Sequence, residues 1–550
     1  MMKRLLWAVL LTPLCALAQV PPAADPGAIQ QRQIEEEMRR REAERERRKA
    51  VEPLKREAPA RPALKPDAAA VRFLVREIEF SPSEILSAAE LEEVARDFRG
   101  RQVSLAELQQ LAERINALYR AKNVVTAQAV IPPQDVSAGI VRVRLIEGRV
   151  GRIEIRGNAT TDTDFILARL GLKPQELVDL DRLEPALVRF NRTNDAPLRA
   201  ELKPGTEFAT TDLLIDIAEP PRHDLRLTLD NHGSAATGEW RTTLAYLNRS
   251  LLGFRDDLSL SYTDASGQTS QSFGYGFPVN TWGGRVNFTH NNDETAIVNG
   301  PLKPLHITGE AVGWGLGLRQ PLHVDNELQL DLAAGLRKRH SANWIGGVFL
   351  QRTDYNERSL GVEFQRFDGG SHWFASLTRH FVTATVTAAD PVSLAIDRGS
   401  VRYSRELAGG LSLRGNLAWQ DTAQKSLPSG ELFFIGGEGR VRGYPVGAYS
   451  GDTGHALNLE LHHPLWAASA DTAGIGASGA FFIDYGRVRP FRPPASTLPE
   501  HERLAGAGWT LLAAAGQRVQ ARLTFATGLK RDRLREHPYE VTLQLIASAF

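Results

Sequence analysis

Residues 457–461 read Leu-Asn-Leu-Glu-Leu, so that every second side chain is leucine and the residues between them are polar. Successive side chains of a β-strand point to opposite faces, and this alternation predicts a strand with one apolar and one polar face. The same pattern recurs between clusters of Asp, Asn, Gly and Ser through residues 222–550, for example at Leu225/Leu227/Leu229, Leu328/Leu330/Leu332 and Val541/Leu543/Leu545. We therefore expect residues 222–550 to form an all-antiparallel β region.

Alternation alone does not distinguish a soluble β-sandwich from a transmembrane β-barrel. The residues opposite the apolar set are polar or small, as a water-filled lumen requires, and aromatic residues recur near the ends of the predicted strands. Eight of the nine tryptophans fall at or after Trp240, and tryptophan concentrates at membrane interfaces. Roughly 330 residues, at about 20 per strand with its turn, allow about 16 strands, which is within the range of outer-membrane barrels.

The first 18 residues have the pattern of a secretory signal peptide, with Lys3 and Arg4 before an apolar run and Ala16-Leu17-Ala18 at its end. The run is too short to span a membrane, and cleavage is expected after Ala18. The only cysteine, Cys15, lies within this segment, so the mature chain has neither disulfides nor cysteine-based metal sites. A net charge of +1 gives no indication of nucleic acid as a partner.

Residues 28–50 contain no Pro or Gly and repeatedly place Glu four residues before Arg, as at Glu35/Arg39 and Glu44/Arg48. Such pairs support an exposed α-helix. Two interpretations remain: a solvated charged helix, or a polar helix lodged as a plug in the lumen of the barrel. Residues 51–70 contain four prolines and are expected to form an extended linker.

Two modules of about 75 residues follow, at 71–149 and 150–220, each with the expected order strand, helix, helix, strand, strand. In the first module, Ser87-x-x-Glu90 and Ser104-x-x-Glu107 are capping boxes that predict the starts of two helices. In the second of these helices, an apolar face is expected from Leu105, Leu108, Leu111, Ile115 and Leu118. A small sheet of this kind can bind an extended, unfolded protein segment at an open edge.

This order resembles that of the two-partner secretion (TpsB) transporters, the ShlB/FhaC-like family with a signal peptide, plug helix, linker, two POTRA domains and a 16-stranded barrel. In the first module, Ile131–Ser137 and Val141–Gly148 look like the family's Pro-Gln-Asp segment and final strand. In the barrel, residues 441–444 look like the VRGY tip of a loop that folds into the lumen, and residues 482–486 like the F-x-D-x-G motif of a wall strand. The resemblance implies that the transport site comprises Val441, Arg442, Gly443, Tyr444, Phe482, Asp484 and Gly486, with Arg442 binding Asp484 through a bidentate contact.

The resemblance further implies an outer-membrane transporter with its POTRA domains in the periplasm. Its expected partners are a large, unfolded TpsA-like exoprotein of haemolysin or adhesin type, outer-membrane lipid, and the machinery that inserts barrels. A BamA-type assembly factor is the alternative. No catalytic motif, cofactor site or metal site is found; the His462-His463 pair has no third ligand nearby and is expected to be a surface or interface feature.

Overall fold

The computed structural model describes residues 25–33, 35, 54–56, 72–122, 124, 126–207, 209–387, 389–469, 474–493, 496–516, 518–530 and 538–549. The predicted signal peptide, and most of the predicted polar helix and linker, lie outside these residues. The chain divides into two compact units, residues 50–220 and residues 1–49 together with 221–550. In the described ranges, no helix combines the length and the apolar character needed to cross a membrane.

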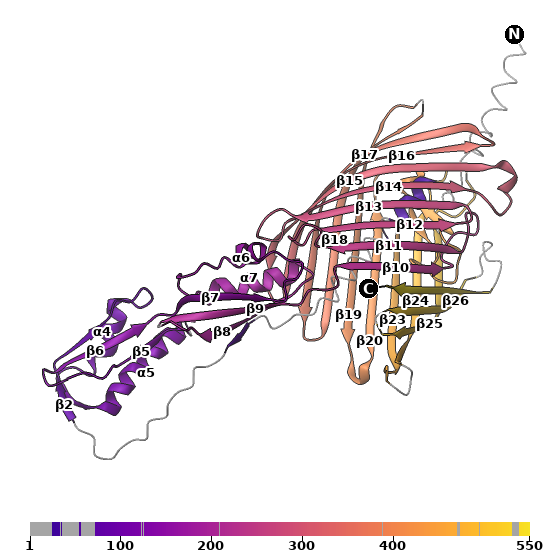
Figure 1. The fold of residues 1–550 in the computed structure, drawn as a ribbon. Coiled ribbons are helices and arrows are strands. Elements are labelled where there is room, and N and C mark those ends of the chain that lie inside the picture. Colours follow the sequence, from indigo (N-terminus) through magenta and orange to yellow (C-terminus); the bar gives the residue numbers. More distant parts are fainter. Residues whose placement is uncertain are drawn as a thin grey trace, which may run out of the picture. The chain divides into compact units, whose positions relative to one another are not determined.

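The larger unit is a closed antiparallel barrel, in which each strand pairs with the next along the chain and the last pairs with the first (Figure 1). This confirms the predicted 16-stranded barrel and rules out a sandwich, because a sandwich would leave open sheet edges. The strands are β10 (His223–Asp230), β11 (Arg241–Arg249), β12 (Asp257–Ala265), β13 (Gln268–Pro278), β14 (Arg285–Ala296), β15 (Ile307–Val324), β16 (Leu328–Ile345), β17 (Val348–Asp368), β18 (Ser371–Val386), β19 (Val392–Glu406), β20 (Ser412–Asp421), β23 (Thr453–Trp466), β24 (Ile475–Arg489), β25 (Glu502–Ala515), β26 (Val519–Gly528) and β27 (Tyr539–Ser548).

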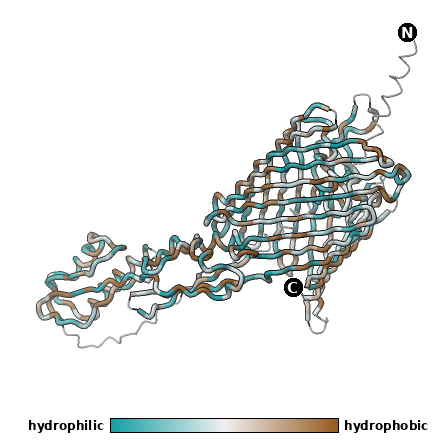
Figure 2. The backbone as a smooth tube through the Cα atoms, turned by 45° about the horizontal axis from the view of Figure 1, so that its top comes forward, coloured by the Kyte–Doolittle hydropathy of each residue, from teal (hydrophilic) through white to brown (hydrophobic). Residues whose placement is uncertain are grey.

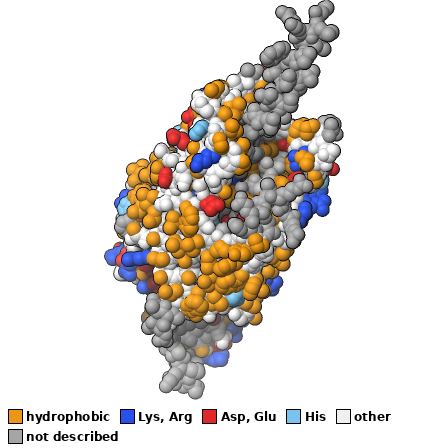
Figure 3. Space-filling view, turned by 90° about the vertical axis from the view of Figure 1, so that its right-hand side faces the viewer, with side chains coloured by type: hydrophobic (Ala, Val, Ile, Leu, Met, Phe, Trp, Pro, Cys, Tyr) orange, Lys and Arg blue, Asp and Glu red, His pale blue; other side chains and the backbone are white. Residues whose placement is uncertain are grey.

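The alternation along these strands separates an apolar outer wall from a polar lumen, and Figure 2 shows hydrophobic and hydrophilic residues interleaved along them. Large apolar side chains such as Leu244, Leu336 and Phe481 are about half exposed, whereas the charged Asp293 and Arg339 are almost fully buried. Figure 3 shows hydrophobic side chains gathered over the barrel wall. Apolar residues outside and charged residues inside are the arrangement expected of a barrel in lipid.

The segment between β20 and β23 folds into the lumen. It contains two short antiparallel strands, β21 (Phe433–Ile435) and β22 (Tyr449–Gly451), and a single turn of 3-10 helix at Ser429–Glu431. Further short 3-10 turns lie at Lys303–Leu305 and Ala408–Gly410. The chain between β21 and β22 carries the 441–444 motif, and we call residues 422–452 the inward loop.

The first module of the smaller unit forms a three-stranded sheet in the order β3-β6-β5, with two helices packed on it. Its elements are β2 (Arg72–Val75), β3 (Glu77–Phe80), α4 (Ala88–Arg96), β4 (Arg101–Ser104), α5 (Leu105–Ala121), β5 (Gln128–Val130) and β6 (Ile140–Ile146). Both capping boxes are formed, as predicted. The predicted apolar face of α5 is correct at Leu108, Leu111 and Ile115, but Leu105 is 60% exposed because it lies in the first turn.

The pairing of β2 with β4 was not predicted. A strand was expected at the position of β2, whereas β4, a short strand between the two helices, was not expected. The Pro-Gln-Asp segment lies against the final strand of the same module. The side-chain amide of Gln134 donates to the Arg142 carbonyl at 2.9 Å and accepts from the Arg142 N–H at 2.8 Å. The Gln134 side chain thus continues the pairing of β5 along β6, which explains why an amide suits this position.

The second module contains β7 (Arg149–Arg156), α6 (Thr163–Leu170), α7 (Leu180–Thr193), β8 (Leu198–Pro204) and β9 (Thr210–Ile217). Its sheet has the order β1-β8-β9-β7, in which β1 (Leu54–Arg56) comes from the linker. β1 pairs in parallel with β8, with Leu54 opposite Ala200. Part of the predicted linker is therefore a strand added to the edge of this sheet.

The cap of α4 predicts a pH dependence for this helix. The Glu90 carboxylate accepts a hydrogen bond from the Ser87 backbone N–H, and this bond, together with one from Lys122, lowers the pKa of Glu90 from 4.5 to about 2. Because the folded pKa is below the unfolded one, the stabilisation is present above about pH 4.5 and is lost as the pH falls toward 2. We expect amide exchange in α4, corrected for its intrinsic rate, to accelerate over that range. In Glu90→Gln this acceleration should be absent; equal acceleration in both proteins would contradict the assignment.

Candidate functional site

The wall side of the candidate site lies on β24, whose alternation directs three motif residues into the lumen. Phe482 and Asp484 are 3% and 0% exposed, while Ile483 between them is 60% exposed on the outer wall. Gly486 continues the inward row. A Cβ atom there would lie 2.7 Å from Cγ2 of Val441 and 2.9 Å from Cγ2 of Ile435, so the absence of a side chain allows the inward loop to pack against the wall.

The tip of the inward loop needs glycine in a similar way. Gly443 has a φ of +84°, and a Cβ atom there would lie 2.7 Å from the backbone of Thr527 and Gly528 on the wall. Both the left-handed conformation and the close approach exclude a larger residue. The loop tip therefore reaches the wall through backbone contact, which places the neighbouring side chains, Arg442 and Tyr444, at fixed positions.

Arg442 binds Asp484 through three hydrogen bonds. Its Nε and Nη2 atoms donate to the two carboxylate oxygens at 2.8 Å each, and its backbone N–H donates to Oδ2 at 3.0 Å. The guanidinium carbon lies 3.5 Å from the centroid of the Phe482 ring. The structure thus brings the two sequence motifs together in a bidentate, charge-assisted contact over an aromatic face.

Tyr444 and Val441 fix the two sides of this contact. Tyr444 is fully buried, and its hydroxyl lies 3.0 Å from the Ala505 carbonyl oxygen and accepts from the Lys530 N–H at 3.2 Å. Val441 is fully buried in an apolar cluster with Ile435 and Val488. The seven residues named from the sequence accordingly form one site between the loop tip and the strands β24–β26.

Three further residues belong to the site and lie on β23, at alternate positions from residue 458 to residue 462. The leucines at 457, 459 and 461 face outward, so Asn458, Glu460 and His462 face the lumen. Asn458 donates to Asp484 Oδ1 at 2.9 Å, and Glu460 accepts from Arg442 Nη1 at 2.7 Å. The alternation predicts that these residues face the lumen, but nothing in the sequence indicates that Asn458 binds Asp484 or that Glu460 binds Arg442.

The expectation for the His462-His463 pair was wrong for His462. Its side chain is buried in the lumen rather than at a surface, and its Nε2 lies 2.7 Å from Glu460 Oε2. Its neighbour His463 points to the opposite face, where its ring stacks with Phe481. Among the described residues, no three His, Cys, Asp or Glu side chains are grouped as metal ligands.

The helical residues 26–33 lie inside the barrel and make specific contacts with its inner wall (indigo in Figure 1). Asp25 accepts from the Asn343 side-chain amide at 3.1 Å and caps the helix by accepting from the Ala28 N–H at 2.9 Å. Gln30 donates to Asp293 at 2.8 Å, and Gln33 donates to Ser270 at 2.8 Å. For these residues the solvated-helix interpretation is wrong, since Asp25, Gln30 and Gln31 are at most 4% exposed.

The helix and the inward loop are also bonded to each other. Glu35 accepts from Arg440 of the loop at 2.6 Å. On the wall, Arg339 donates to the Gly27 carbonyl at 3.1 Å and forms an ion pair with Glu431 at the base of the loop. Glu431 also binds Arg398 at 2.7 Å. Polar contacts therefore hold the helix, and together with the apolar cluster around Val441 they hold the inward loop; water can replace the polar contacts when either one moves out.

Two protein-family models match the chain. The model for haemolysin secretion/activation protein ShlB/FhaC/HecB matches residues 210–512, and the model for the ShlB-type POTRA domain matches residues 73–148. Heme/hemopexin transporter protein HuxB of Haemophilus influenzae is 24% identical over 416 residues, which is 72% of each chain. Outer membrane transporter CdiB of Dickeya dadantii is 25% identical over 415 residues, covering 72% of this chain and 73% of the relative.

Solved structures share the fold at low sequence identity. CdiB from Escherichia coli superposes with a TM-score of 0.66 at 20% identity, over 95% of this chain and 98% of that one. BamA from Haemophilus ducreyi lacking POTRA domains 1–3 gives a TM-score of 0.53 at 14% identity, over 87% of this chain and 100% of that one. At these identities the likeness concerns the fold alone.

Proposed function

The chain belongs to the ShlB/FhaC/HecB family of haemolysin secretion/activation proteins, the outer-membrane transporters of two-partner secretion, and we propose that its exoprotein crosses the membrane through the lumen that the helix and the inward loop now fill. The protein is located in the outer membrane with its POTRA region in the periplasm. It exports a partner protein. The route through the lumen, the unfolded state of that client and the roles of the motif residues are parts of the proposal.

The observation that carries the proposal is the polar attachment of both lumen occupants. The inward loop also packs apolar residues such as Val441 against the wall, but the bonds of Arg442 to Asp484 and of Gln30 to Asp293 can be exchanged for hydrogen bonds with water. We infer that the helix leaves first and that the loop anchor then controls how far the lumen opens. The VRGY and F-x-D-x-G residues act as this anchor.

Capture of the client is proposed to occur at the edges of the two small sheets. An extended segment of the chain itself, β1, already lies along β8 of the second module. This pairing supports the idea that the edge of β8 accepts an extended strand through main-chain hydrogen bonds, which tolerate many sequences. A client strand that replaces β1 would also pull on the linker, and thereby on the helix that precedes it in the chain.

We further propose that transport needs no catalytic step or cofactor, with folding of the client outside the cell as the driving force. Members of the family are transporters. The likeness to BamA is one of fold alone, so barrel assembly receives no separate support. Outer-membrane lipid and the host's barrel-assembly machinery are the other proposed partners.

The test compares culture supernatants by mass spectrometry. The strains are the native host, a deletion strain, and the deletion strain carrying either the wild-type chain or Arg442→Ala. We expect one large exported protein to disappear in the deletion and Arg442→Ala strains and to return with the wild-type chain. A broad loss of many outer-membrane barrels from the deletion strain would instead assign the protein to barrel assembly and overturn the proposal.

A further inference from the structure

On the outer wall of the barrel, four side chains form a row across four neighbouring strands. Trp419 of β20 lies opposite His455 of β23, His455 lies opposite Arg487 of β24, and Arg487 lies opposite Arg503 of β25. Residues directly opposite each other in a sheet share a face. The face is the outer one, because Gln420 and Val488 alternate with the row and are buried on the inner side.

The row lies where the apolar band of the wall ends. Two residues further along each strand, the row Leu417, Leu457, Tyr485 and Ala505 is apolar or aromatic. Two residues span roughly 7 Å along a strand, so the basic row is within one headgroup's reach of the hydrocarbon. β10 begins directly after the periplasmic region, and counting antiparallel strands from it places the ends of β20 and β24 at the opposite, external rim.

Among the described residues, the two arginines of the row have no ion-pair partner. Like charges directly opposite each other destabilise a sheet. Within the described part of the chain, no carboxylate forms an ion pair with Arg487 or Arg503, although the neighbouring Arg489 binds Glu500 at 2.7 Å. Elsewhere on the outer wall, Arg379 has a matched partner in Asp397, with bonds of 2.8 and 2.6 Å. The described residues thus leave this pair of arginines able to bind an anion from outside the chain.

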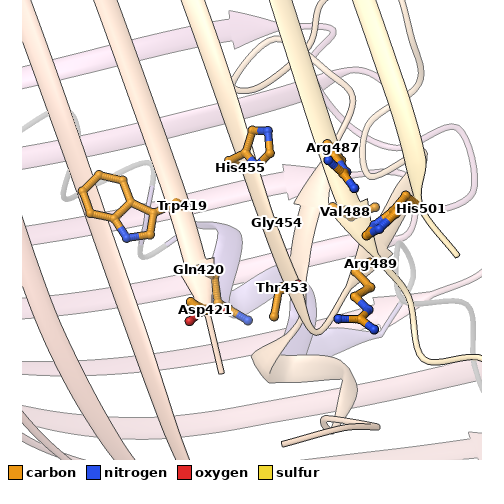
Figure 4. Close-up of a pocket in the computed structure, with 10 residues that line it drawn as sticks. All are labelled: Trp419, Gln420, Asp421, Thr453, Gly454, His455, Arg487, Val488, Arg489 and His501. Atoms are coloured by element: carbon orange, nitrogen blue, oxygen red, sulfur yellow. The ribbon is translucent and has the colours of Figure 1, made fainter. Parts of the chain in front are cut away.

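A hollow of about 310 Å³ is lined by three residues of the row, Trp419, His455 and Arg487, and by His501, as Figure 4 shows. Arg503 lies next to Arg487, on β25 and beside the hollow. Arg489 also lines it, as does one carboxylate, Asp421. We propose that it binds the phosphorylated headgroup of a lipid of the outer leaflet, with its acyl chains along the leucine rows below. Planar guanidinium groups bind phosphate through paired, charge-assisted bonds, and tryptophan favours the membrane interface.

The proposal is tested with the full chain in detergent micelles by native mass spectrometry. The probes are bis-phosphorylated lipid A, the same lipid without phosphates, and inorganic phosphate as a competitor. The variants are Arg487→Gln/Arg503→Gln and, as the matched control, Arg405→Gln, which removes an exposed arginine from the outer face at the opposite rim. Heat-modifiable electrophoretic mobility checks that each barrel is folded.

We expect the wild type and Arg405→Gln to bind the phosphorylated lipid equally and to prefer it over the phosphate-free lipid. The double variant should bind at least roughly tenfold more weakly, since each lost arginine removes charge-assisted bonds. Unchanged binding by a folded double variant, or equal binding of the two lipids, would overturn the proposal. Displacement of the lipid by an equal concentration of inorganic phosphate would identify a free-anion site and overturn the assignment to lipid.

Discussion

A disulfide between positions 27 and 341 is expected to stop secretion, and its reduction is expected to restore it. A Cβ atom on Gly27 would lie 3.2 Å from the Cβ of Ser341 on the inner wall. Disulfide-linked Cβ atoms are about 3.5–4.5 Å apart, so a small shift brings the pair into range. The only native cysteine, Cys15, lies in the predicted signal peptide, so Gly27→Cys/Ser341→Cys has no competing native thiol in the mature chain.

The reason for the expected loss is covalent retention of the helix in the lumen, which leaves no room for the client. The measurement is the amount of exported partner protein in the medium with and without a reductant, together with the fraction of cross-linked chain. Gly27→Cys and Ser341→Cys as single variants control for the substitutions themselves, and both should secrete normally. If the fully cross-linked chain secreted at the wild-type level, the client would have to follow another route.

The barrel was predictable because its determinants are local. Alternation at Leu457, Leu459 and Leu461 depends only on the neighbours along the strand, and the capping box that begins at Ser104 spans four residues. The closed barrel confirms the first of these predictions, and the start of α5 at Leu105 confirms the second. The pairing of Arg442 with Asp484 was expected only through resemblance to a family, since the two residues are 42 positions apart.

The contacts of the polar helix were not predictable, because they depend on which wall residues face the lumen at the same depth. Gln30 and Asp293 are 263 positions apart, and no pattern in either segment identifies the other. The charged pattern that predicts this helix begins at Glu35, whereas the residues that contact the wall lie before it. Glu460 was missed for a related reason: its inward direction was implied, but the position of the loop above it was not.

The substitution Asp484→Asn is expected to release the inward loop. It leaves Arg442, which is 5% exposed, with Glu460 as its remaining charged partner. Loss of one partner from a buried ion pair costs about 3–5 kcal/mol, so the released state should become at least roughly a hundredfold more populated. Trypsin added to intact cells, followed by mass-spectrometric mapping, should cut after Arg440 or Arg442 much faster than in the wild type, because these residues would then be accessible from outside.

The matched control is Asp397→Asn, which neutralises another wall aspartate that binds an arginine through two bonds, Arg379. That pair lies on the outer face, where its arginine side chain is 57% exposed, and an exposed ion pair contributes only about 0–1 kcal/mol. Its cleavage pattern should therefore match the wild type. Equal trypsin sensitivity of the two variants would mean that any loss of charge from the wall loosens the barrel. Resistance of Asp484→Asn to trypsin would show that the close backbone packing at Gly443 and Gly486, together with Tyr444, holds the loop without the ion pair.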